Sequence, residues 1–121
     1  QALQGLPLTV YGDGAQTRCF CYVDDMIEGL VRLMNDDSDH AEEPVNLGSA
    51  DERTLQEIVA ALSAIFGRDL AVEYKPLPAD DPKRRRPDCG RARERLGRSP
   101  TVDLRKGLST TVEYFEDRLR G

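Results

Sequence analysis

Apolar residues recur every three to four positions in four stretches of the chain, which is the spacing of one face of an α-helix. The first predicted helix begins at Asp24, which can cap it, and ends near Asn35. The second follows Thr54 and Glu57, which form a capping box, and it stops at Gly67. The two remaining predicted helices run from Asp88 to Leu96, before Gly97, and from about Asp103 to Leu119.

Short runs rich in β-forming residues lie between these helices. The predicted strands are residues 8–11, 17–23, 45–47 and 71–74. The run Gly12-Asp13-Gly14 is a turn signal, since glycine tolerates the positive φ angles of tight turns. Residues 75–87 contain four prolines, which are incompatible with regular structure. Short strands separated by helices predict a single α/β domain over residues 1–121.

The composition restricts the partners of the chain. Its net charge of −5 argues against nucleic acid or an anionic membrane surface as a partner of the whole molecule. No apolar run approaches the roughly 20 residues of a membrane span. The three cysteines have no metal-ligand spacing, so we expect free thiols in a reducing cytoplasm and no metal site. Because the chain starts at Gln1 rather than Met, we expect a fragment of a longer protein.

Motifs for catalysis are missing from the sequence. No glycine-rich turn follows a predicted strand, so no cradle for a dinucleotide phosphate is predicted. No Tyr is followed four residues later by Lys, and the only histidine, His40, lies in an acidic loop. We therefore expect no catalytic residue in this chain and no activity from the chain alone.

The first segment with the chemistry of a ligand site covers residues 7–18. The extended backbone of residues 8–11 offers amide and carbonyl groups that could read the edge of a nucleobase. Arg18 enters the next predicted strand, where its planar guanidinium could bind phosphate oxygens. The alternative is an ordinary hairpin with an exposed arginine.

The second such segment covers residues 80–88, where four consecutive cations stand inside an acidic protein. They repel one another unless an anion or an acidic patch offsets their charge. The alternatives are a solvated basic loop paired with neighbouring acids and, against the net charge, nucleic-acid binding. Asp88 could act only as a helix cap. Asn46, inside a short apolar run, needs a hydrogen-bond partner, either backbone or ligand.

These segments, in this order, resemble the extended short-chain dehydrogenase/reductases that modify nucleotide sugars, and most closely the UDP-glucuronic acid decarboxylases, which form UDP-xylose. The resemblance covers nearly the whole chain and is carried by residues 1–5, 8–14, 16–18, 20–25, 44–48, 81–88 and 96–97. It implies that the chain is the C-terminal, substrate-binding portion of an NAD(P)-binding Rossmann fold, without the dinucleotide-binding half. The sequence differs from the usual sequence of these proteins at Cys19, at Arg98 and over residues 49–53.

The resemblance also implies a role for each matching residue. Thr9, Val10 and Tyr11 would line the base, and Arg18 and Arg85 would bind the pyrophosphate. Asp88 would contact the ribose, and Asn46 would lie near the diphosphate. NAD would bind to the N-terminal Rossmann domain of the longer protein and would oxidise the sugar C4 hydroxyl before carbon dioxide is lost. The resulting NADH would then reduce the ketone.

Two other interpretations stay open. Within the same superfamily, the longer protein could be a dTDP-glucose 4,6-dehydratase or a UDP-sugar 4-epimerase. In a different class, the chain could be a non-catalytic module that associates with itself, because its apolar faces would otherwise pack on the Rossmann domain.

Overall fold

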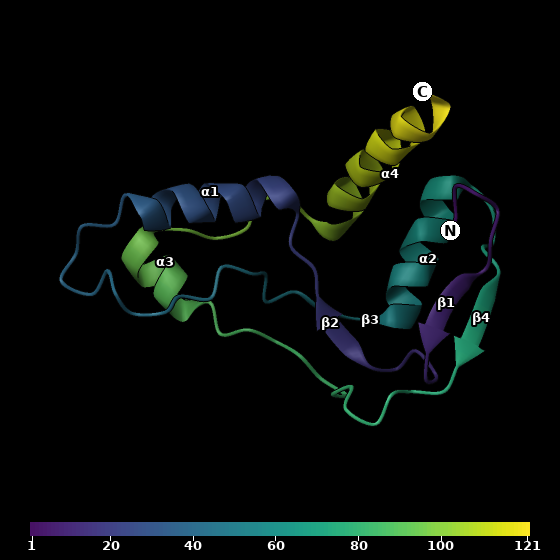
Figure 1. The fold of residues 1–121 in the computed structure, drawn as a ribbon, viewed down its shortest axis with the longest axis horizontal. Coiled ribbons are helices and arrows are strands. Elements are labelled where there is room, and N and C mark those ends of the chain that lie inside the picture. Colours follow the sequence, from purple (N-terminus) through teal and green to yellow (C-terminus); the bar gives the residue numbers. More distant parts are fainter.

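The computed structural model describes residues 1–121 as two small sheets and four helices (Figure 1). In chain order the elements are β1 (Leu8–Tyr11), β2 (Thr17–Cys19), α1 (Val23–Met34), β3 (Glu52–Thr54), α2 (Leu55–Phe66), β4 (Val72–Lys75), α3 (Gly90–Leu96) and α4 (Leu104–Arg120). Strands and helices share one chain, so the α/β class is confirmed. No helix combines the length and the apolar character needed to cross a membrane.

The first sheet pairs β1 with β4 in parallel, with Leu8 opposite Val72 and Tyr11 opposite Lys75. Parallel neighbours need a long crossover, and here α2 lies within it. The carboxyl ends of both strands therefore lie at the same edge of the sheet, at the bottom of Figure 1. The segments that follow, residues 12–16 and 76–81, leave the sheet from that common edge.

The second sheet pairs β2 with β3 in antiparallel fashion, and Thr17 lies opposite Thr54. Thr54 ends β3 and is also the N-cap of α2, so one residue joins the sheet to the helix. The predicted capping box is present: Thr54 accepts from the Glu57 N–H, and the Glu57 carboxylate accepts from the Thr54 N–H. Gly67 ends α2 with a left-handed φ of 64°, as predicted.

Helices α1 and α3 pack together at the other end of the molecule (Figure 1). The Arg32 guanidinium of α1 donates to the carbonyls of Leu96 and Gly97, both at 2.8 Å. Few apolar side chains are fully buried, and one face of α1 is largely exposed. Its exposed members are Val23, Ile27, Leu30, Val31 and Met34. The three cysteines are free thiols, as expected.

The predicted strand over residues 45–47 is wrong, because these residues pair with no other strand. Leu47 is buried, as its apolar character suggested, but its carbonyl accepts from the Arg98 guanidinium at 2.9 Å rather than from a neighbouring strand. The strand that does form nearby is β3, whose sequence Glu-Arg-Thr carries no apolar signal. The predicted strand 17–23 ends early, at Cys19.

Two predicted helix caps also need correction. The N-cap of α1 is Tyr22, so Asp24 lies inside the first turn and does not cap. The neighbouring Asp25 is the buried carboxylate. The N-cap of α3 is Cys89, although the Asp88 carboxylate accepts from the Gly90 N–H at 2.8 Å and satisfies the first amide of the helix. The predicted start of α4 near Asp103 is confirmed, and Asp103 is its N-cap, accepting from the Lys106 N–H at 2.9 Å.

Candidate functional site

The structure brings the two segments with ligand chemistry together at Thr17, the first residue of β2. The Thr17 N–H donates to the Lys83 carbonyl at 3.0 Å, and the Arg85 N–H donates to the Thr17 carbonyl at 3.3 Å. Thr17 and Arg84 thus form an isolated parallel bridge. The basic segment lies along the edge of β2 like a short third strand, next to Arg18. This closeness follows from the parallel pairing of β1 and β4, which starts both segments from one edge.

Arg18 is held by the chain itself. Its Nη1 donates to the Thr17 carbonyl at 2.7 Å, and its Nη2 forms an ion pair with the Asp81 carboxylate. The Arg18 side chain keeps 20% of its surface exposed. The predicted phosphate-binding guanidinium is therefore partly accessible, and a carboxylate oxygen occupies one of its terminal nitrogens.

A second ion pair fixes the basic segment to β3. The Arg84 guanidinium donates to both oxygens of Glu52, through Nε and Nη2, each at 2.7 Å. Glu52 also accepts from the Thr17 hydroxyl at 2.5 Å. These hydrogen bonds, from Arg84 first and Thr17 second, lower the pKa of Glu52 from its ordinary 4.5 to about 2. Glu52 is therefore a carboxylate at any physiological pH.

Arg85 and Arg86 differ from these paired arginines. Both are exposed, and neither guanidinium has an ion pair or a hydrogen bond within the chain. The interpretation of residues 80–88 as a basic loop paired with neighbouring acids thus accounts for Arg84 but leaves Lys83, Arg85 and Arg86 without an ion pair. Like charges at adjacent positions attract an anion.

Strand β1 presents one edge to β4 and the other to glutamine side chains. The Gln1 amide accepts from the Thr9 N–H at 3.2 Å and donates to the Thr9 hydroxyl at 3.0 Å. The Gln16 amide donates to the Tyr11 carbonyl. Thr9 therefore binds an amide with its N–H as the donor and its hydroxyl oxygen as the acceptor. The edge of a pyrimidine base offers the same combination of donor and acceptor groups. Tyr11 is 46% exposed.

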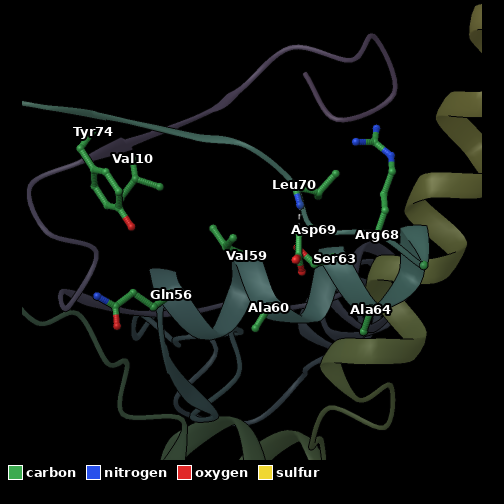
Figure 2. Close-up of a pocket in the computed structure, with 11 residues that line it drawn as sticks. Val10, Gln56, Val59, Ala60, Ser63, Ala64, Arg68, Asp69, Leu70 and Tyr74 are labelled. Carbon is green, nitrogen blue, oxygen red and sulfur yellow. Dashed lines mark hydrogen bonds between the residues drawn. The ribbon is translucent and has the colours of Figure 1, made fainter.

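Val10, in contrast, points into the chain. Its side chain is 5% exposed and lies opposite α2, beside Val59 and Tyr74 (Figure 2). These residues line a cavity of about 840 Å³ between α2 and the β1–β4 sheet. The side chain of Val10 is thus used in packing, and its backbone faces β4, because Leu8 and Gly12, two residues to either side, donate their N–H groups to the Ala71 and Lys75 carbonyls.

Asn46 and Asp88 form the third part of the candidate site. The Asn46 amide donates to the Asp88 carbonyl at 3.0 Å, so the partner that Asn46 needed is a backbone group. Next to them, a polar cavity of about 310 Å³ is lined by Arg86, Asp88 and Arg93 among others. Four of the seven predicted site residues thus adjoin in pairs: the Arg85 backbone contacts Thr17 and Cys19 on either side of Arg18, and Asn46 binds Asp88. Thr9, Val10 and Tyr11 lie apart from them on β1.

Sequence reasoning missed Glu52 and Asp81, the two acids that orient the arginines. Glu52 lies 32 residues from Arg84, and no local pattern relates the two. Asp81 stands within the basic segment, but which cation it pairs with is decided only by the fold. Arg98, a buried cation, was noted only as an unusual residue.

The N-termini of α1, α2 and α4 do not fit the phosphates of a dinucleotide. Such a cradle needs free backbone N–H groups behind a glycine-rich turn. Here α2 is closed by its capping box and α4 by the Asp103 carboxylate, while α1 carries Asp24 and Asp25 in its first turn. Residues that would hold NAD are thus not assigned within this chain.

Residues 1–48 match the model of the NAD dependent epimerase/dehydratase family. Over 119 residues the chain is 44% identical to UDP-glucuronic acid decarboxylase 1 of Danio rerio, an alignment that covers 98% of this chain. The first 48 residues are thus similar to the NAD dependent epimerase/dehydratase family, and the whole chain is similar to part of a UDP-glucuronic acid decarboxylase.

Solved nucleotide-sugar epimerases contain a region with the same fold as this chain. The crystal structure of UDP-glucuronic acid 4-epimerase from Bacillus cereus, in complex with UDP-glucuronic acid and NAD, superposes with a TM-score of 0.91 at 32% identity over 97% of this chain. The UDP-glucose 4-epimerase from Thermotoga maritima, with UDP-glucose, gives a TM-score of 0.87 at 33% identity over 97% of this chain. The chain spans 28% of the length of the fish decarboxylase and 37% of the length of each epimerase.

Proposed function

We propose that residues 1–121 form the nucleotide-sugar-binding domain of a longer NAD-dependent UDP-glucuronic acid decarboxylase, an enzyme whose product is UDP-xylose. The similarity to decarboxylases supports the choice of reaction. The observation that carries the proposal is the convergence of Arg18 and the Arg85 segment at Thr17. Arginines on two adjacent segments suit a diphosphate, whose oxygens accept charge-assisted hydrogen bonds.

In this proposal the diphosphate lies against Arg18 and Arg85. Arg85 has no partner within the chain, so a phosphate adds contacts there without breaking any. The base lies along the edge of β1 that faces away from β4 and is contacted by Thr9 and Tyr11, where it takes the place of the Gln1 amide, while the Val10 side chain supports the strand from α2. These groups share one end of the molecule, since Gln16 links the carboxyl end of β1 to β2.

Asn46 and Asp88 complete the proposed site. Asp88 contacts the ribose, and Asn46 holds the backbone of Asp88 while lying near the diphosphate. The groups that would hold NAD and carry out the reaction are proposed to belong to an N-terminal Rossmann domain of the longer protein. That domain and the UDP-sugar are then the two partners of residues 1–121.

Calorimetric titration of the chain with UDP and with uridine tests the clamp. Arg85→Ala should weaken UDP binding by roughly tenfold or more, because one charge-assisted interaction is lost. It should leave uridine binding unchanged, since uridine has no phosphate. The matched control is Arg105→Ala, which removes an exposed arginine from α4. If UDP does not bind at millimolar concentration, or if both variants bind it equally, the clamp is refuted.

A UDP-sugar 4-epimerase is the second candidate function, and the likeness to the Bacillus cereus and Thermotoga maritima epimerases favours it. Binding experiments do not separate the two, because both enzymes bind a UDP-sugar. Incubating the longer protein with UDP-glucuronate and NAD does separate them. Release of carbon dioxide with formation of UDP-xylose supports the decarboxylase, and conversion to UDP-galacturonate without gas release supports the epimerase.

A further inference from the structure

Arg98 is the most deeply buried large side chain of the molecule, with 2% of its surface exposed. It follows α3 and reaches across to three other segments. Its Nη1 donates to the carbonyls of Leu47 and Gly48, both at 2.9 Å. Its Nη2 donates to the Asp25 carbonyl at 2.7 Å and to the Cys21 sulfur at 3.5 Å. One guanidinium therefore ties the start of α1 to the loop before β3.

This contact is unusual because the charge of Arg98 is not matched by a carboxylate in direct contact. The Asp25 carboxylate, close by, is bound to Thr101 and Val102 instead. The Nε of Arg98 has no hydrogen-bond partner at all. A buried cation with an unsatisfied donor costs free energy, so a role beyond stability would account for its presence.

The surroundings of Arg98 are shaped for it. A Cβ atom added at Gly29 in α1 would lie 3.0 Å from the Arg98 Nε and 3.2 Å from the Leu47 side chain. Glycine at this helical position thus makes room for the guanidinium, against its weak helix propensity. On the far side, a Cβ atom at Gly48 would lie 3.2 Å from the Pro87 ring.

The carbonyls that Arg98 holds lead directly to the candidate site. Leu47 and Gly48 follow Asn46, whose amide binds the Asp88 carbonyl. Gly48 also abuts Pro87, the residue before Asp88, and its carbonyl accepts from the Cys89 thiol at 3.5 Å. The position of residues 47–48 therefore sets the position of Asn46 and Asp88.

We propose that Arg98 is a positioning residue for the Asn46–Asp88 part of the nucleotide-sugar site. The inference rests on the proposed function, in which Asp88 contacts the ribose. Arg98 touches neither ligand nor solvent; it acts through the two carbonyls. Lysine cannot replace it, because a single ammonium group cannot span the carbonyls on both sides of the guanidinium.

The test compares UDP with inorganic pyrophosphate as ligands, because pyrophosphate lacks the ribose that Asp88 contacts and is held mainly by Arg18 and Arg85. In Arg98→Lys the Kd for UDP should rise roughly tenfold, the factor carried by about one hydrogen bond, while the Kd for pyrophosphate stays within about twofold. The ratio of the two constants is the readout. A loss of folded protein changes both constants equally and leaves the ratio unaltered.

The matched control is Arg32→Lys, because Arg32 also donates through Nη1 to two consecutive carbonyls, but at the end of α3. It should leave the ratio unchanged. If Arg98→Lys does not fold, Gly29→Ala displaces the guanidinium without removing it and should shift the ratio in the same direction. An unchanged ratio in the folded Arg98 variant, or an equal shift in the Arg32 variant, overturns the proposal.

A second readout separates this inference from the proposed function. The NMR signal of the Asn46 side-chain amide, which reports its bond to Asp88, should move in Arg98→Lys and not in Arg32→Lys. If wild-type chain binds neither UDP nor pyrophosphate, the proposed function fails. The Asn46 signal then still decides whether Arg98 positions this segment, and a signal that does not move refutes it.

Discussion

Replacing Asp25 should destabilise the fold far more than replacing its neighbour Asp24. Asp25 is 6% exposed, and its carboxylate accepts three hydrogen bonds. The donors are the Thr101 N–H and hydroxyl, each at 3.0 Å, and the Val102 N–H at 2.9 Å. These bonds join the first turn of α1 to the segment that leads into α4.

The magnitude follows from the donors that Asp25→Ala would leave without a partner. A hydrogen bond to a charged group contributes about 1.5–3 kcal/mol, and such contributions are not additive. The positive charge of Arg98 would also lose its nearby carboxylate, and breaking a buried charge arrangement costs about 3–5 kcal/mol. We therefore expect the free energy of unfolding to fall by about 3–5 kcal/mol.

Asp24→Ala is the matched control, since Asp24 is exposed in the same helical turn. This variant loses only the interaction of the Asp24 carboxylate with the helix dipole, which should lower the free energy of unfolding by about 0.3–1 kcal/mol. Urea denaturation followed by circular dichroism measures both. With a slope of about 2 kcal/mol per molar urea, Asp25→Ala should lower the midpoint by about 2 M. If Asp25→Ala does not fold, Asp25→Asn, which keeps one acceptor oxygen, replaces it. Equal midpoints for the variants of Asp24 and Asp25 would refute the reasoning.

Two further predictions concern acid stability and self-association. The pKa of Glu52 is lowered from its ordinary 4.5 to about 2. The ionised carboxylate therefore stabilises the fold fully above about pH 4.5, and this stabilisation is lost as the pH falls toward about 2. The difference in melting temperature between wild type and Glu52→Gln should therefore shrink over that range; a difference independent of pH would contradict this. The exposed apolar face of α1 predicts association between copies of the chain, which Ile27→Lys should weaken in light scattering. A wild-type monomer at high concentration would count against it.

Much of the local structure could be predicted from the sequence, because its causes are local. The capping box of Thr54 and Glu57 needs only residues three apart, and Gly67 ends the helix because it adopts a left-handed φ without strain. The strand of residues 8–11 and the helices also follow from periodicity. The two ligand segments were predictable as chemistry, since Arg18 and the arginine run stand out in an acidic chain.

Only the tertiary structure decided how these pieces meet. The parallel pairing of β1 with β4 places the two ligand segments side by side, and partners more than 60 residues apart leave no local pattern. The tertiary structure also decided which aspartate is buried. Asp24 and Asp25 are adjacent and chemically identical, yet only Asp25 binds Thr101. The apolar run around Leu47 read as a strand, but an arginine 51 residues away satisfies its carbonyl. Long-range hydrogen bonds, rather than propensity, set these features.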